Sequence, residues 1–221
     1  LYFYTLIRYN KLLAQRNKIL KEKSPSLKDM LLILEEQLLP AAELIILKRK
    51  AFAEKLSAET KKQHAVLSGG EDFELVYETE ELDYSDIKGS LSKIYKKTLE
   101  KDMRLEYTTA GPHRDDLKIM AGGIDIRKYG SQGQQRTATL SMKLAECHLH
   151  KEAAGEMPVL LLDDVLSELD ITRQKALLNA AKGIQTIITC TEFDHSLVDS
   201  PLLKITIGAD SKIVKKAMIN N

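Results

Sequence analysis

The chain has 221 residues, of which 43% are hydrophobic and 29% are charged. This composition is typical of a soluble globular protein and excludes an intrinsically disordered one, and the length allows one large domain or two small ones. Its 33 basic and 32 acidic side chains nearly cancel, so any nucleic-acid contact would need a local basic patch. The apolar stretches are too short to span a membrane, and two cysteines outside any zinc pattern predict a reducing, cytoplasmic location.

The first third of the sequence predicts helices. Apolar residues recur at helical spacing over 2–22, and the Ser-Pro-Ser at 24–26 breaks the pattern and offers one of its serines as an N-cap. The spacing then predicts a long amphipathic helix over 27–60, kinked near Pro40. The opening LYFYTLIRYN lacks Met and is already apolar and aromatic, so we expect the chain to begin within a longer protein.

The remainder mixes strands with helices. A double glycine ends the helical region, and we then expect a strand at 74–79, a helix at 85–101 and strands at 105–111 and 116–123. From residue 130 the pattern predicts a turn at 130–136, a helix ended by Gly155, a strand at 159–164, a helix at 168–182, a strand at 186–191, and a hairpin at 202–214 that turns at Gly-Ala-Asp. Continuously apolar strands joined by a helix predict a buried parallel sheet.

The apolar strand VLLLDD ends at two adjacent acids, Asp163 and Asp164, and Asp170 follows in SELD. The carboxyl ends of parallel strands are where α/β sheets bind ligands. A Mg²⁺ ion would offset the repulsion between the paired acids and bridge them to phosphate oxygens. Alternatively, one acid caps the following helix and the other faces solvent, and this pattern alone leaves both interpretations open.

The stretch GSQGQQRT lies immediately before a helix. Two glycines and a serine at such a place expose backbone N–H groups to an anion. The alternative is a plain N-cap turn with Ser131 as the cap. The order of loop, helix, acid-tipped strand and SELD favours a phosphate site over the plain turn.

SQGQQRT followed by PVLLLDDVLSELD resembles the RecF family of bacterial recombination mediators, within the ABC and structural-maintenance-of-chromosomes (SMC) ATPase class. LAQRNKILK, TTAGPHRDDL and QTIITCT add to the resemblance, which therefore covers nearly the whole chain. It implies an α/β fold, with the C-terminal half of an ABC/SMC-like P-loop ATPase head (a parallel sheet with helices) and a mostly helical arm. The implied domains are the arm with a short strand–helix segment at 1–104 and the head part at 105–221.

The resemblance also implies roles for the acids. VLLLDD resembles a Walker B strand, in which Asp163 would hold Mg²⁺, partly through water. Asp164 occupies the place of the catalytic carboxylate that polarises the attacking water. Asp170 matches the aspartate of the D-loop, which in this class acts across a dimer interface.

GSQGQQR resembles the ABC signature, so that Ser131 and Gly133 would meet the γ-phosphate of ATP bound to the other subunit. Gln132 replaces the first glycine of the commoner Ser-Gly-Gly form, as the RecF family itself does. The implied nucleotide-binding set is Ser131, Gln132, Gly133, Gln134 and Asp170. Arg136 is expected to orient the first helical turn or to form a salt bridge.

Two features depart from the wider class. Where that class often has a histidine after the next strand, this sequence has Thr-Cys-Thr, so Thr189 or Thr191 would donate a hydrogen bond instead, and a role for His195 is left open. None of the eleven glycines is followed by Lys and then Ser or Thr, as a P-loop requires. We therefore expect this chain alone to bind ATP weakly at best and not to hydrolyse it.

Basic residues offer contacts with DNA or between domains. Arg114 follows His113 in the Gly-Pro-His-Arg turn, and Lys48, Arg49 and Lys50 form a cluster on the long helix. The alternatives are a turn held by an Arg–Asp ion pair and a solvated helix face, and the role of His113 is left open.

The resemblance implies an ATP-dependent homodimer that binds double-stranded DNA and single/double-strand junctions and helps to load RecA at gaps with RecR and RecO. Its cofactors would be ATP and Mg²⁺, and no membrane is expected to take part. Two alternatives remain, namely a non-enzymatic module that binds a partner or dimerises through the arm, and a different SMC-like DNA-repair ATPase.

Overall fold

The computed structural model describes residues 1–22, 26–198, 201–208 and 212–219. The chain divides into two compact units. The first combines Leu1–Lys55 with Leu75–Lys118, and the second combines Leu56–Glu74 with Ile119–Asn221. Each unit is therefore built from two separate stretches of the sequence. The domain boundary predicted at 104/105, which divides the arm from the head part, stays a prediction.

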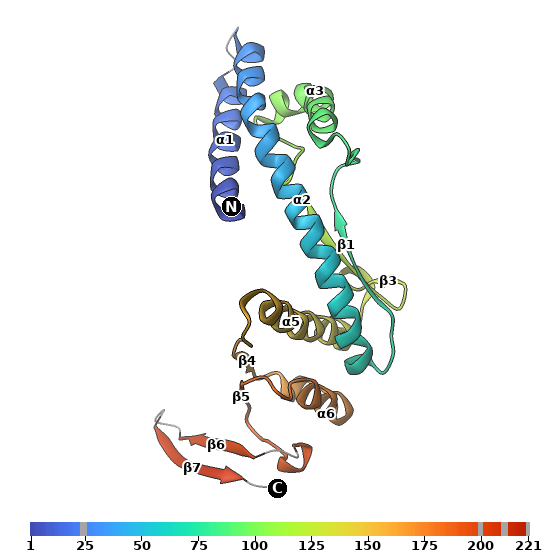
Figure 1. The fold of residues 1–221 in the computed structure, drawn as a ribbon, viewed down its shortest axis with the longest axis vertical. Coiled ribbons are helices and arrows are strands. Elements are labelled where there is room, and N and C mark those ends of the chain that lie inside the picture. Colours follow the sequence, from blue (N-terminus) through green and yellow to red (C-terminus); the bar gives the residue numbers. More distant parts are fainter. Residues whose placement is uncertain (23–25, 199–200, 209–211, 220–221) are drawn as a thin grey trace. The chain divides into compact units, whose positions relative to one another are not determined.

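The elements alternate between helical and strand-rich stretches (Figure 1). The helices are α1 (Tyr2–Glu22), α2 (Leu27–Ser68), α3 (Ile87–Leu105), α4 (Ile126–Tyr129), α5 (Gln132–Ala154) and α6 (Ile171–Ala180), with 3₁₀ helices η1 (Leu166–Glu168) and η2 (His195–Leu197). The strands are β1 (Phe73–Glu78), β2 (Asp116–Ala121), β3 (Ile124–Asp125), β4 (Leu160–Asp163), β5 (Thr186–Thr189), β6 (Leu202–Ile207) and β7 (Ile213–Ile219). Across the described ranges, every helix falls short of the length or apolarity that crossing a membrane requires.

The predicted helices at the start of the chain are confirmed. α2 continues past the predicted end to Ser68 and includes Pro40 within the helix. Gly69 and Gly70 then terminate it with φ of 79° and 106°, a left-handed backbone that glycine adopts without steric cost. Ser26 directly precedes α2, whereas the other predicted cap, Ser24, lies outside the described residues.

The first unit has a core made by three helices. Apolar faces of α1, α2 and α3 pack together, and the core is completed by Ala110 from the segment that follows α3. α3 begins where the Asp86 carboxylate accepts a hydrogen bond from the Gly89 amide at 2.9 Å. The buried residues of this three-helix core are Tyr9, Leu12, Leu34, Leu38, Ala41, Ala42, Ile45, Ile46, Ile87, Leu91, Tyr95 and Ala110.

The strand predicted at 105–111 is wrong. This segment is irregular, with Glu106 at φ 61° and Gly111 at φ 112°. The Thr108 amide donates to Asn17 Oδ1 at 2.8 Å, and the Thr109 amide donates to Asp102 Oδ1 at 2.9 Å. Side chains therefore accept the hydrogen bonds that a neighbouring strand would accept in a sheet.

The second unit holds the predicted parallel pair. β4 and β5 pair from Leu160↔Thr186 to Asp163↔Thr189. Leu160 and Leu162 are buried, but Leu161 is 68% exposed and Ile187 is 55% exposed. The parallel pairing is confirmed, while the expectation of a sheet buried on both faces is wrong for these two strands.

The end of the described chain is a hairpin. β6 and β7 pair antiparallel from Leu202↔Ile219 to Ile207↔Ile213, as predicted. The Gly208 amide donates to the Lys212 carbonyl at 2.8 Å and so closes the strands. The remaining predicted turn residues, Ala209 and Asp210, lie outside the described residues.

Candidate functional site

The paired acids lie at the carboxyl end of β4 and are held by β5. The Asp164 amide donates to the Thr189 carbonyl at 3.1 Å and to its hydroxyl oxygen at 3.0 Å. The Thr189 hydroxyl in turn donates to Asp163 Oδ1. The single hydroxyl hydrogen of Thr189 is thus used within the site, while Thr191 is exposed. That Thr189 or Thr191 donates a hydrogen bond to a phosphate stays a prediction.

Asp164 has a left-handed backbone, with φ of 50°. Among residues other than glycine, Asp and Asn tolerate this conformation best. Asp163 and Asp164 are both exposed, so their carboxylates are accessible to a ligand.

The donor set at β4 suits an ion that brings its own ligands. Within the described ranges, no group of three or more His, Cys, Asp or Glu side chains could enclose a metal. Mg²⁺ is commonly held by one or two carboxylates together with water and substrate phosphates. Asp163 and Asp164 therefore fit a Mg²⁺ ion that binds with a phosphate ligand.

The serine loop (residues 130–136) forms a capping box at the start of α5. Ser131 Oγ accepts from the Gln134 amide at 3.2 Å, and Gln134 Oε1 accepts from the Ser131 amide at 3.0 Å. The prediction that Ser131 is the N-cap of this helix is thus confirmed. Ser131 and Gln132 are also exposed, so the capping box leaves the loop open to an anion.

Two arginines join the serine loop to the segment around Asp170. Asp170 caps α6 by accepting from the Arg173 amide at 2.9 Å, and the two side chains form an ion pair at 3.4 Å. Arg173 Nη1 lies so close to Gly133 that a Cβ there would be 3.0 Å from it. Arg136 pairs with Glu168 at 2.6 Å, which confirms its salt-bridging role. The structure therefore brings together the two segments that the resemblance assigns to a partner's nucleotide.

The basic cluster on α2 is partly used within the first unit. Arg49 donates to Tyr2 Oη at 3.0 Å and to the Pro112 carbonyl, and it lies 4.0 Å from Asp115. Lys50 lies 3.6 Å from the centroid of the Tyr84 ring, whereas Lys48 is exposed. Asp115 of the Gly-Pro-His-Arg turn therefore pairs with Arg49 of α2, whereas the expected ion pair was one within the turn.

Arg114 and His113 also hold this turn in place, through contacts with the Thr108 carbonyl and with Tyr9. Arg114 donates to the Thr108 carbonyl at 3.3 Å, and its guanidinium lies 5.0 Å from the Tyr107 ring centroid. His113 Nε2 lies 3.0 Å from that carbonyl, which can only accept, so Nδ1 is the acceptor for the Tyr9 hydroxyl at 2.8 Å. Burial lowers the His113 pKa, which agrees with a neutral ring. These contacts favour a positioning role within this unit.

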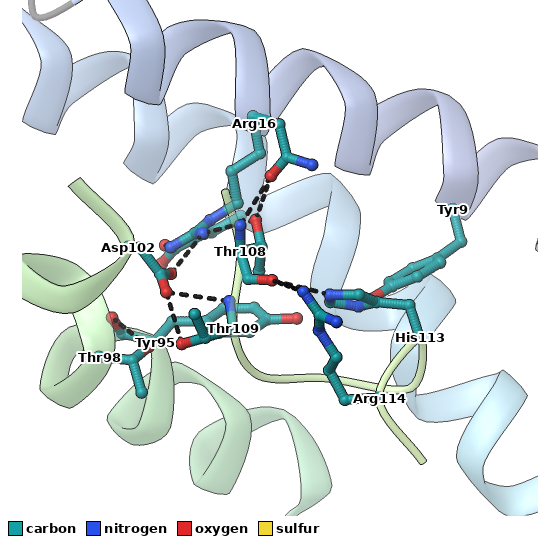
Figure 2. Close-up of polar contacts among 11 residues, drawn as sticks. Tyr9, Arg16, Tyr95, Thr98, Asp102, Thr108, Thr109, His113 and Arg114 are labelled. Atoms are coloured by element: carbon teal, nitrogen blue, oxygen red, sulfur yellow. Dashed lines mark hydrogen bonds and ion pairs between the residues drawn. The ribbon is translucent and has the colours of Figure 1, made fainter. Parts of the chain in front are cut away.

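A buried ionic cluster anchors this segment to α1 (Figure 2). Arg16 is fully buried and donates to Asp102 Oδ2 and to Thr108 Oγ1, both at 2.8 Å. It also lies 3.6 Å from Glu35, and its guanidinium stacks 5.0 Å from the centroid of the Tyr95 ring. One arginine thereby connects α1, α2, α3 and the segment after α3.

Known proteins resemble this chain in both sequence and fold. Curated proteins called DNA replication and repair protein RecF are 48% identical over 219 residues in Lachnoclostridium phytofermentans and 44% identical over 191 residues in Clostridium acetobutylicum. These alignments cover 96% and 86% of this chain. The solved structure of the recombination mediator protein RecF-ATP in the RecFOR pathway matches 98% of the chain, with a TM-score of 0.78 and 36% identity. The chain belongs to the RecF family.

The RecF comparisons also set the fold and the extent of the match. The structure of RecF-ATPrS, from the same pathway, matches 93% of the chain with a TM-score of 0.76. The predicted α/β fold, with a parallel strand pair and a helical arm, is thus confirmed. The chain spans 59% and 53% of the lengths of the two curated RecF relatives. No protein-family model matches the chain.

Sequence reasoning missed three residues that shape the site in this RecF-family chain. Arg173 was detectable as a base three positions after a capping acid, an arrangement that favours an ion pair. Glu71 accepts from Gln134 Nε2 at 2.9 Å, and His64 contacts Glu71 at 3.3 Å. Nothing in the local sequence indicates this last pair of contacts. The His195 ring packs edge-on against the Phe193 ring, with 5.5 Å between their centroids, and its role stays open.

Proposed function

We propose that this chain supplies the arm and the partner-facing half of a nucleotide site in a RecF-type DNA repair and replication ATPase. The observation that carries the proposal is the joining of the serine loop to the Asp170 segment by Arg173 and Arg136. A RecF relative solved as RecF-ATP has the same fold, which supports ATP as the ligand.

In the proposed mechanism each residue has a limited task. Asp163 would hold Mg²⁺, and the ion would supply positive charge to the phosphates. Asp164 accepts a hydrogen bond from the attacking water and orients it. Ser131, with Gly133 and the first amides of α5, contacts the γ-phosphate of ATP held by a second subunit, and Asp170 supports that contact. Gln132 and Gln134 are the other loop residues that we propose bind the nucleotide, and Gln134 also closes the capping box with Ser131.

ATP would then act as a dimerising ligand. Each γ-phosphate would contact both subunits, so hydrolysis would remove contacts across the interface and open the dimer. We propose further that the dimer binds DNA at single/double-strand junctions and acts with RecR, RecO and RecA. The support is the relatives' name and their place in the RecFOR pathway. Of the four basic residues considered for DNA, Lys48 and Arg114 are exposed, whereas Arg49 and Lys50 are half-buried.

The exposed face of β4 and β5 supports a larger assembly. Leu161 and Ile187 lie on neighbouring strands and remain exposed, whereas Leu160 and Leu162 on the other face of the pair are buried. In RecF-type heads we expect this apolar face to pack against the further part of the head that contains the P-loop. The chain alone would then lack the main triphosphate contacts.

The isolated 221-residue chain is therefore expected to bind ATP only weakly and to show no turnover. A P-loop lysine and its backbone amides neutralise the phosphates, and no GK[ST] sequence is present to supply them. Isothermal titration calorimetry with MgATP tests this. A dissociation constant of about 1 mM or below, equivalent to roughly 4 kcal/mol of binding free energy, would contradict it.

Ser131→Arg should block ATP-driven dimerisation in a full-length RecF protein that carries this sequence. The larger side chain would fill the space meant for the partner's γ-phosphate and remove the serine contact. Two charge-assisted contacts are lost per dimer, so dimerisation should weaken about 100-fold or more. Analytical ultracentrifugation with a non-hydrolysable ATP analogue measures the effect.

The matched control is Thr139→Arg. Thr139 is also exposed on α5 but lies beyond the serine loop. This variant should dimerise normally, and both variants should keep the ATP affinity of the monomer. Normal dimerisation of Ser131→Arg would refute the proposed contact across the interface.

A further inference from the structure

Glu71 occupies a junction between the end of α2 and the serine loop. Its amide donates to Ser68 Oγ at 3.0 Å, which ties its backbone to the last residue of α2. One carboxylate oxygen, Oε1, accepts from Gln134 Nε2 at 2.9 Å, and the other, Oε2, lies 3.3 Å from His64 Nε2. The carboxylate thus contacts two elements at once.

The contact with Gln134 determines which way round its amide lies. Gln134 Oε1 accepts from the Ser131 amide, so its Nε2 must point the other way and needs an acceptor. Glu71 is that acceptor. Reversing the amide would bring two N–H donors together at Ser131 and two acceptors together at Glu71, so the carboxylate selects the orientation that closes the capping box.

His64 fastens the same junction to α5. Its side chain is fully buried, and its Nδ1 lies 3.2 Å from Ser141 Oγ. A carboxylate oxygen only accepts, so His64 Nε2 carries the hydrogen that faces Glu71, and Nδ1 lies beside Ser141 Oγ, whose hydroxyl is also 2.7 Å from the Thr137 carbonyl. α2 therefore reaches α5 directly through Ser141 and indirectly through Glu71 and Gln134.

The space around Glu71 is closely filled. Gly122, in the turn between β2 and β3, has φ of 56°, and a Cβ there would lie 2.8 Å from Glu71 Oε1. The Gly122 amide donates to the Asp72 carbonyl at 3.0 Å, which fixes this turn against the chain next to Glu71. The carboxylate is thereby confined to the position in which it meets Gln134.

We propose that Glu71 is a positioning residue for the serine loop. Its carboxylate holds Gln134, and hence Ser131, in place, and it couples the loop to the last turns of α2. Its effect on nucleotide rests on the proposed function of Ser131, whereas its effect on the loop does not. A displacement of the loop on phosphate binding would be transmitted to α2 through this carboxylate, and a movement of α2 would displace the loop.

Hydrogen–deuterium exchange on the 221-residue chain tests the positioning role without nucleotide. In Glu71→Ala the amides of Ser131, Gln134 and Gln135 should exchange about tenfold faster, as expected for losing one hydrogen bond to a charged group. Exchange in β4 and β5 should not change. Glu71→Gln should restore slow exchange, because its carbonyl can accept from Gln134, while its amide donates to His64 Nε2 once the ring hydrogen has moved to Nδ1, beside Ser141 Oγ.

Asp72→Ala is the control for losing a neighbouring acid. Asp72 is 73% exposed and pairs with Lys61 at 2.7 Å, away from the serine loop. Unchanged exchange of the serine loop in Glu71→Ala would overturn the inference. Equal acceleration in Asp72→Ala, or acceleration that extends through β4 and β5, would also overturn it, because it would show general loosening.

The nucleotide part is tested in a full-length RecF protein that carries this sequence. Glu71→Ala should raise the ATP concentration needed for half-maximal dimerisation about tenfold, matching the loss at the loop, and Glu71→Gln should restore it. The ATP affinity of the monomer should stay unchanged. Normal dimerisation despite a loosened loop would overturn the coupling to nucleotide, and Ser131→Arg then shows separately whether the interface contact itself is wrong.

Discussion

Arg16→Met is expected to destabilise the first unit by about 3–5 kcal/mol, the cost of removing one partner from a buried ion pair. Arg16 and Asp102 are both fully buried, so the Asp102 carboxylate would keep its charge while losing its guanidinium partner at 2.8 Å. Thr109 would still donate to Asp102, but Thr108 would lose its contact with α1 through Arg16. Methionine retains much of the apolar stem, so the loss reports on the charge and its hydrogen bonds.

Urea unfolding followed by circular dichroism measures this loss, since the chain has no tryptophan to report by fluorescence. Lys18→Ala is the matched control on α1, because its pair with Glu22 is exposed and should contribute nothing measurable. Arg16→Met with Asp102→Asn should lose less than the sum of the single variants, because no unpaired charge remains buried. A loss for Arg16→Met below about 1 kcal/mol, the range of surface pairs, would contradict this account.

The same cluster shows where sequence patterns stop being informative. LEYTTAG has the short alternation typical of a strand, yet Thr108 bonds to Arg16 and Asn17, which are about ninety positions earlier in the chain. A local pattern carries no information about such partners. The long helices were predictable because their apolar spacing is repeated over many turns, and α5 also has recognisable capping residues at both ends.

The candidate site was predictable to the extent that it lies in contiguous motifs. Asp163, Ser131 and Asp170 each lie in a short segment with its own turn or strand pattern. The contacts that orient them come from elsewhere, as Thr189 does for Asp163 and Glu71 does for Gln134. Pairings between separate elements depend on packing, and a single sequence does not encode them in any local spacing.

Burial of the sheet illustrates a second limit. VLLL was expected to be buried on both faces because it is apolar at every position. In the described chain Leu160 and Leu162 are buried while Leu161 is exposed. An apolar run reports what a strand is suited to pack against, and the second layer need not come from the same stretch of residues.

Asp164→Asn is expected to slow ATP hydrolysis by about 100- to 10,000-fold in a full-length RecF protein that carries this sequence, the range for losing a general base. Asparagine is the suitable replacement because Asp164 has φ of 50°, a conformation that Asn adopts at lower cost than alanine. The Asp164 amide can still donate to Thr189, so the turn after β4 should keep its shape. The change therefore removes the basic oxygen without straining the backbone.

Because the proposed contacts across the dimer interface come from Ser131 and Asp170, Asp164→Asn should still dimerise with ATP and should hold the dimer longer than the parent protein. Single-turnover hydrolysis separates the chemical step from ATP binding. Glu192→Gln is the matched control, since it changes an exposed acid shortly after β5 to its amide and should leave turnover unaffected. Turnover that is unchanged in Asp164→Asn would show that this carboxylate does not orient the water, and a loss of dimers would show that Asp164 acts on ATP binding instead.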